Sequence, residues 1–145
     1  MLDELEALYR AKLPQFRRAA AAIAGDEEAG RDAVQEAFAT AVRQRRTWRR
    51  RGPLEAWVWR IVVNKARDAR RRRPKPVEPA PAVNLPDVPL ESLTERQREI
   101  VFLHYYADLD YAEIADALRI SVGTVGATLN AARKTLRTAM EEVRA

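Results

Sequence analysis

The sequence predicts an all-α protein made of two small helical domains joined by a Pro-rich linker. Apolar residues recur at helical spacing before and after one segment, residues 73–89, and that segment holds six of the eight prolines. Proline lacks an amide donor and fixes its own φ, so the segment favours an extended spacer over a helix. A chain of 145 residues also suits two modules with modest cores.

The first domain is expected to contain three helices, or four if Pro14 divides the first one. Helical spacing covers residues 2–24, and a second helix follows Asp26. The inward stripe of this second helix is predicted at Ala33, Val34, Ala37, Phe38, Ala41 and Val42. A third helix starts near Pro53, which a first turn tolerates, and runs to about Arg73. Its inner side is predicted at Leu54, Trp57, Val58, Ile61 and Val62.

The second domain carries three helix start signals. Thr94 opens a capping box with Gln97, and Asp110 with Glu113 gives the next helix a similar start. Ser121 caps a third helix, whose inward residues are predicted at Val125, Leu129, Ala132 and Leu136. Two short helices joined by RIS are typical of a helix-turn-helix, although an ordinary helical hairpin has the same pattern.

Positive charge is concentrated in the first domain. Residues 41–73 hold 13 of the 26 basic residues, and only Glu55 and Asp68 oppose them, so this stretch carries +11 in a chain whose net charge is +5. All three tryptophans also lie there. Cationic groups attract phosphates and flat rings accept unstacked bases, so nucleic acid is the first partner to consider.

Other classes of protein are disfavoured by composition. The absence of cysteine excludes disulfides, thiolate metal sites and a cysteine nucleophile. The acidic start MLDELEALYR does not resemble a signal peptide, and no apolar run approaches the length of a membrane span. We expect a soluble, cytoplasmic protein. Asp108, Asp110 and Glu113 invite a metal-site interpretation, but two of them are already explained as helix caps, so we expect no metal and no cofactor.

Two sets of motifs resemble one known family. In the second domain, LTERQREIVFLHYY followed by EIADALRISVGTV resembles domain four of the extracytoplasmic-function (ECF) sigma factors of bacterial RNA polymerase. In the first, DAVQEAF and AWVWRIVVNKARDARRRR resemble two helices of domain two in the same family, in the same order. The resemblance implies sigma domain two as a three- to four-helix bundle over 1–73, a linker over 74–89 and sigma domain four over 90–145.

The resemblance assigns recognition of the minus-ten promoter element to the first domain. The loop at 47–52 would capture a flipped base, and the helix after it would read the promoter. Asn64 suits a base edge best, because its amide both donates and accepts. The candidates are Trp48, Arg49, Arg50, Arg51, Trp59, Arg60, Asn64, Lys65, Asp68 and Arg71.

The three tryptophans have competing interpretations. Helical phase places Trp57 on the inner side, so we do not count it as a DNA contact. Trp59 lies about 200° around the helix from Trp57, and Trp48 lies in the predicted loop. Both are candidates either for base contact or for packing.

The second domain would read the minus-thirty-five element. The candidates are Ser121, Thr124, Thr128, Asn130, Arg133, Lys134 and Arg137. Family members commonly place arginine, lysine or serine just after T-V, but here Gly126 and Ala127 follow, so we predict weak or atypical readout. Gly126 also costs ~1 kcal/mol in a helix, which indicates either close approach by another group or simple tolerance.

An acidic face of the second helix is the predicted polymerase-binding surface. Its residues are Asp32, Gln35, Glu36 and Ala39, which helical phase alone would interpret as an ordinary solvated face. The resemblance implies docking on core RNA polymerase there.

The resemblance therefore implies a sigma factor that binds core RNA polymerase and promoter DNA and directs initiation without an active site of its own. An anti-sigma factor is a common further partner in the family. The alternative is a stand-alone helix-turn-helix regulator or a sigma-like protein.

Overall fold

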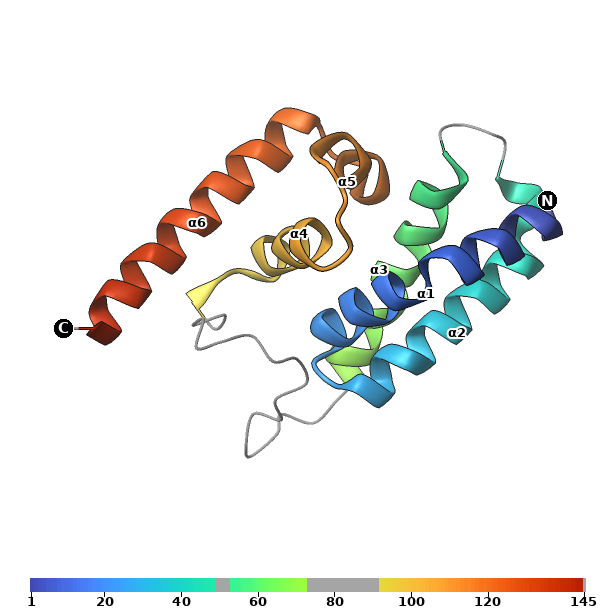
Figure 1. Cartoon of the computed structure of the whole chain (residues 1–145), viewed down its shortest axis with the longest axis horizontal. Helices are drawn as coiled ribbons and strands as arrows, with labels where there is room; N and C mark the ends of the chain where they lie inside the picture. Colours follow the sequence, from blue (N-terminus) through green and yellow to red (C-terminus); the bar gives the residue numbers. More distant parts are fainter. Residues whose placement is uncertain (49–52, 73–91, 145) are drawn as a thin grey trace. The chain divides into compact units, whose positions relative to one another are not determined.

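The computed structural model describes residues 1–48, 53–72 and 92–144, and all regular structure in these ranges is helical (Figure 1). The chain divides into two compact units, Met1–Val83 and Asn84–Ala145, which we describe separately. The predicted all-α class is confirmed. The expected Pro-rich linker lies outside the described residues. None of the helices in these ranges is long and apolar enough to cross a membrane.

The first unit consists of α1 (Leu2–Ala24), α2 (Glu27–Arg43), a 3-10 turn η1 (Arg45–Thr47) and α3 (Leu54–Arg72). Local signals set the ends of α1 and α2. Gly25 ends α1 with a left-handed φ of 84°, and the Asp26 carboxylate accepts from the Ala29 amide at 2.9 Å. Pro14 lies inside α1, and the kink expected there falls at Lys12, whose φ is −124°.

The core of the first unit is built on aromatic rings from all three helices. The Phe16 ring of α1 packs edge-on against Phe38 of α2 at 5.3 Å and lies 4.2 Å from the Trp59 ring of α3, centroid to centroid. Near the start of α2, Gly30 touches the backbone of α1: a Cβ built on it would lie 2.5 Å from Ala21 Cα. The backbones of α1 and α2 are therefore in direct contact at Gly30.

The inner side predicted for α3 is wrong, because the face that is buried is shifted by about one residue along the helix. The buried residues are Ala56, Val58, Trp59, Val62, Val63 and Ala66, whereas Leu54, Trp57 and Ile61 are only half-buried. Trp59 can be buried because its indole N–H donates to Glu55 Oε2 at 3.3 Å. In α2, Val42 was predicted inward but is 38% exposed, and Thr40 is buried in its place.

The second unit consists of α4 (Glu95–Tyr105), α5 (Tyr111–Leu118) and α6 (Val122–Arg144). The capping boxes predicted at Thr94 and Asp110 are both present. The Ser121 hydroxyl accepts from the Thr124 amide at 3.0 Å, as a cap of α6 should. Helices α5 and α6 form the predicted helix-turn-helix around Arg119, which adopts φ 56°. The core of the second unit contains Ile100, Leu103, Leu109, Ile114, Val125, Leu129 and Ala132, while Leu136 is half-buried.

Candidate nucleic-acid interface

One face of α3 carries most of the predicted minus-ten residues. Arg60, Asn64, Asp68 and Arg71 follow one another at spacings of four, four and three, so they share a side of the helix. Asn64, Asp68 and Arg71 are exposed, and Arg60 is half-buried. The structure therefore presents the Asn64 amide, which can both donate and accept, between Arg60 and Asp68, with Arg71 further along the same face.

Lys65 points toward α2. Its Nζ lies 3.3 Å from Glu36 Oε1, and this pair joins a predicted DNA-binding residue to a predicted polymerase-binding residue. The Glu36 side chain remains half exposed, at 52%. An exposed pair of this kind contributes little to stability, so both groups remain available to partners.

The aromatic candidates separate into one buried ring and one half-buried pair. Trp59 is 1% exposed, so the prediction that it contacts DNA is wrong. Trp57, which we had assigned to the core, is half-buried and lies 6.4 Å from Trp48, ring centroid to centroid, with 31° between the planes. The Trp48 indole nitrogen finds no hydrogen-bond partner among the described residues. The candidates Arg49, Arg50 and Arg51 lie outside those residues.

The outer face of α2 is exposed at each predicted polymerase-binding position: Asp32, Gln35, Glu36 and Ala39. Gln35, Ala39 and Val42 are one turn apart, so the small Ala39 lies between a polar and an apolar side chain. The face thus combines acidic groups with an apolar strip that a partner can approach closely.

The exposed side of α6 bears most of the minus-thirty-five candidates. Ser121, Thr124, Asn130, Lys134 and Arg137 are exposed, and Thr128 and Arg133 are half-buried. The Ser121 and Thr124 hydroxyls hydrogen-bond each other at 2.7 Å, which occupies them in the helix cap. Asn130 is left as the exposed amide on this helix, with Lys134 one turn further on.

Arg133 is held by aromatic side chains that the sequence did not mark as functional. Its Nε donates to the Tyr105 hydroxyl at 3.1 Å, and its guanidinium carbon lies 5.9 Å from the centre of the Tyr105 ring. The hydrogen bond to Tyr105 and the nearby Tyr111 hydroxyl raise the pKa of Arg133. No sequence signal identified the two tyrosines, because their side chains meet Arg133 only in the folded unit.

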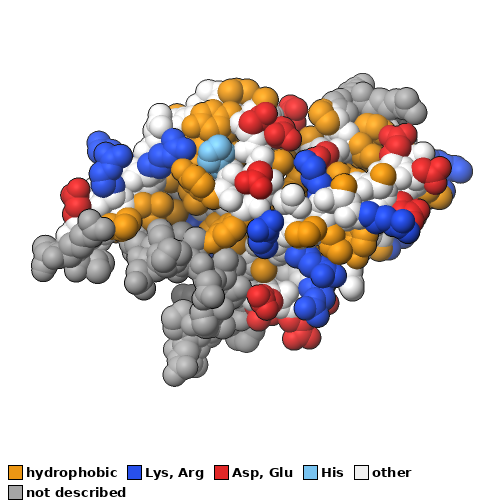
Figure 2. All heavy atoms as spheres, in the orientation of Figure 1, with side chains coloured by type: hydrophobic (Ala, Val, Ile, Leu, Met, Phe, Trp, Pro, Cys, Tyr) orange, Lys and Arg blue, Asp and Glu red, His pale blue; other side chains and the backbone are white. Residues whose placement is uncertain are grey.

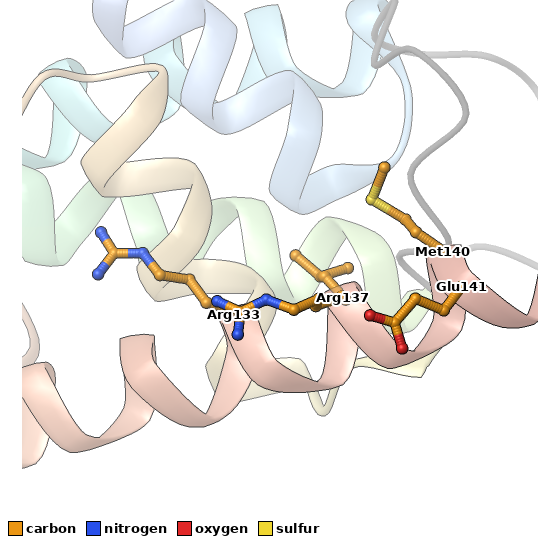
Figure 3. Close-up of a pocket in the computed structure, with 5 residues that line it drawn as sticks. Arg133, Arg137, Met140 and Glu141 are labelled. Carbon is orange, nitrogen blue, oxygen red and sulfur yellow. The ribbon is translucent and has the colours of Figure 1, made fainter.

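The C-terminal half of α6 carries a shallow hollow of about 350 Å³. The described residues around it are Arg133, Leu136, Arg137, Met140 and Glu141. Figure 3 shows Arg133 extending back toward the N-terminal half of the helix, away from Met140 and Glu141. On the face drawn in Figure 2, basic and acidic side chains are interspersed.

Comparison with known proteins bears on both units. Residues 8–75 match the Sigma-70 region 2 family, and residues 90–136 match the family described as Sigma-70, region 4. The RNA polymerase sigma-E factor of Streptomyces coelicolor is 26% identical, over 92% of this chain and 84% of the relative. The ECF RNA polymerase sigma factor EcfG of Rhodopseudomonas palustris is 27% identical, over 94% and 84%. The chain belongs to the ECF sigma factors.

Solved structures agree with this assignment. CnrH, in a complex with the cytosolic domain of CnrY, is 25% identical with a TM-score of 0.79, over 98% of this sigma factor and 90% of that chain. RpoE of Bartonella quintana, in a complex with the anti-sigma factor NepR, shares the fold at 20% identity with a TM-score of 0.70, over 95% and 97%. The family predicted from the sequence is confirmed.

Proposed function

We propose that this sigma factor binds core RNA polymerase through the outer face of α2 and reads promoter DNA through α3 and α6. The observation that carries the proposal is that α2 and α3, which pack together, have exposed faces of different chemistry. The α2 face offers Glu36 and Ala39, and the α3 face offers Asn64 on the same side as Arg60 and Arg71. A single small unit could then bind a protein and DNA at the same time.

Minus-ten recognition would combine a base-edge contact with stacking. Asn64 can bond adenine in a bidentate manner, and Arg71 would neutralise a phosphate. The Trp48 and Trp57 rings would supply a stacking surface for an unpaired base, a contact worth ~1–3 kcal/mol per base. The initiation factor would hold the melted strand in this way, while polymerase carries out the chemistry.

Minus-thirty-five recognition would depend on few base contacts. Ala127 and Ala131 are exposed on α6 and offer no hydrogen bonds, although their methyl groups suit a thymine methyl. Asn130 would be the principal base reader, with Lys134 and Arg137 on phosphates. The weak or atypical readout predicted from the sequence remains a proposal.

Regulation by an anti-sigma factor is a further part of the proposal. It is supported by the similar fold of RpoE, which was solved with the anti-sigma factor NepR. The protein would act in the cytoplasm, where it would lend specificity to polymerase without catalysis of its own.

Run-off transcription with bacterial core polymerase on a promoter pool tests the proposal. Asn64→Ala should reduce the selected transcripts, and Glu36→Arg should abolish both transcription and binding to core polymerase. Lys65→Gln is the matched control for the core-binding readout of Glu36→Arg only, because it breaks the same ion pair and leaves the α2 face intact. Glu6→Arg, on the exposed side of α1, controls for charge reversal alone.

The outcomes distinguish a sigma factor from a regulator. Transcripts that require core polymerase, with the variants ranked as above, support the proposal. Firm duplex binding without polymerase, and no core-dependent transcripts, would contradict it and leave a helix-turn-helix regulator.

A further inference from the structure

The Tyr105 hydroxyl holds the guanidinium of Arg133 at the side of the recognition helix. Tyr105, at the end of α4, accepts from Arg133 Nε at 3.1 Å, and the Tyr111 hydroxyl, at the start of α5, contributes to the raised pKa of Arg133. The three groups therefore come from three helices of the second unit.

The tyrosine rings are themselves fixed by His104. Its ring lies edge-on to Tyr105 at 4.8 Å and to Tyr111 at 5.6 Å, centroid to centroid. His104 Nδ1 in turn lies 3.0 Å from the Leu109 carbonyl oxygen. A half-buried histidine thus orders both tyrosines before any ligand arrives.

The hydrogen-bond directions leave donors unused. Arg133 donates and has no acceptor, so the Tyr105 oxygen that bonds it serves as an acceptor and keeps its own O–H, and the Tyr111 O–H is likewise left to donate. Within the described residues, Arg133 forms no ion pair with a carboxylate. The cluster therefore presents a positive charge and two free O–H donors, which is the chemistry that a phosphate oxygen requires.

The cluster is also exposed to solvent and lies on the same side of α6 as Asn130, the proposed base reader. Tyr105 is 54% exposed, which is unusual for so large a ring, and Arg133 and Tyr111 are half-exposed. Asn130 and Arg137 lie three residues before and four residues after Arg133, so they share its side of α6. A phosphate bound there would lie at the edge of the groove that Asn130 enters.

We propose that Tyr105, Tyr111 and Arg133 form a three-donor site for one backbone phosphate of promoter DNA beside the minus-thirty-five element. The inference rests on the proposed function. Tyr105 positions Arg133, and both tyrosines bind the phosphate directly, so the site anchors α6 where base readers are few. A phosphate contact of this kind sets register and orientation and adds no sequence preference of its own.

Binding of the holoenzyme to promoter DNA over a range of salt concentrations tests the site. Tyr105→Phe and Tyr111→Phe should each weaken binding by about tenfold, with the salt dependence unchanged because no charge is lost. Arg133→Gln should lower the slope of log K against log salt by about one. The Tyr105→Phe effect should shrink in the Arg133→Gln background, because the hydroxyl then has no cation beside it.

Tyr106→Phe is the matched control. The Tyr106 hydroxyl is buried and has no hydrogen-bond partner among the described residues, so its removal should leave DNA affinity unchanged. Methylphosphonate substitution, which neutralises one phosphate at a time, should reveal a single position where wild type and Tyr105→Phe bind alike.

Each outcome is decisive for the phosphate site. Lowered thermal stability of the tyrosine variants with unchanged DNA affinity would show that the cluster only fastens α6 to α4 and α5, and would overturn the inference. Tyrosine-dependent binding without any such methylphosphonate position would overturn it too. A wild-type protein that fails to bind promoter DNA with core polymerase would instead contradict the proposed function.

Discussion

Lys65 Nζ lies 3.3 Å from Glu36 Oε1, so one ion pair connects α3, the proposed promoter-reading helix, to α2, the proposed polymerase-binding helix. Either partner of the sigma factor would compete with this contact. Polymerase that engages Glu36 would release Lys65, and the added cation would favour DNA. The pair is partly exposed, so this coupling is small beside the contacts of either interface.

Glu36→Gln should change the free energy of unfolding by less than about 1 kcal/mol, because exposed ion pairs contribute little. Thermal unfolding measures this, and Glu6→Gln, which breaks the exposed Arg10–Glu6 pair on α1, is the control. A large loss of stability in Glu36→Gln alone would mean that the pair is structural, and that loss of polymerase binding in variants at this position reflects misfolding.

Gly30→Ala should destabilise the first unit by about 1–3 kcal/mol or more, because overpacking forces backbone to move. The new Cβ would lie 2.5 Å from both Ala21 N and Ala21 Cα. Urea unfolding checks this value. Gly123→Ala is the comparison, since only Ser121 Oγ, at 3.9 Å, approaches a Cβ there. Equal stability of the two variants would contradict this prediction and show that α1 and α2 can move apart at Gly30 without loss of free energy of unfolding.

Gly126→Ala should stabilise the second unit by up to about 1 kcal/mol, the helix-propensity difference between the two residues. The added Cβ would meet Tyr111 Cε2 at 3.5 Å, an ordinary contact. Of the two explanations that the sequence left for this glycine, tolerance therefore fits better than close approach. A lower melting temperature for the variant would reverse that conclusion.

Trp59→Ala should cost about 3–5 kcal/mol of stability, because it empties the space beside Phe16. Trp57→Ala should cost much less, since its ring is only half-buried, but it should weaken opening of the minus-ten element. Denaturant unfolding and permanganate footprinting of melted thymines separate the two effects. If Trp57→Ala lost as much stability as Trp59→Ala, the proposed stacking surface would be part of the core.

The sequence predicted the helices of the second unit well because their ends are encoded locally. Thr94, Asp110 and Ser121 each act on amides three residues away, and such contacts can be recognised from spacing alone. The face of α3 was not predictable in the same way. Trp57 and Trp59 are both aromatic and two residues apart, and only the indole bond to Glu55 and the Phe16 ring decide which is buried.

The candidate site shows the same division between local and distant contacts. The exposure of Asn64 and of the acidic α2 face follows from helical phase, which the sequence contains. The association of Arg133 with Tyr105 joins residues 28 positions apart, so no local sequence pattern predicts it. The ion pair between Lys65 and Glu36, which are 29 positions apart, also cannot be predicted from helical periodicity.

The caps at Thr94, Asp110 and Ser121 also determine how the second unit acquires its structure. Each of its three helices starts from a signal held within its own first turn, and the helices that pack together follow one another closely along the chain. Contacts of short sequence separation close with little loss of chain entropy, so domains of this kind fold in microseconds to milliseconds. The second unit, with its recognition helix, should therefore fold rapidly, without slow intermediates.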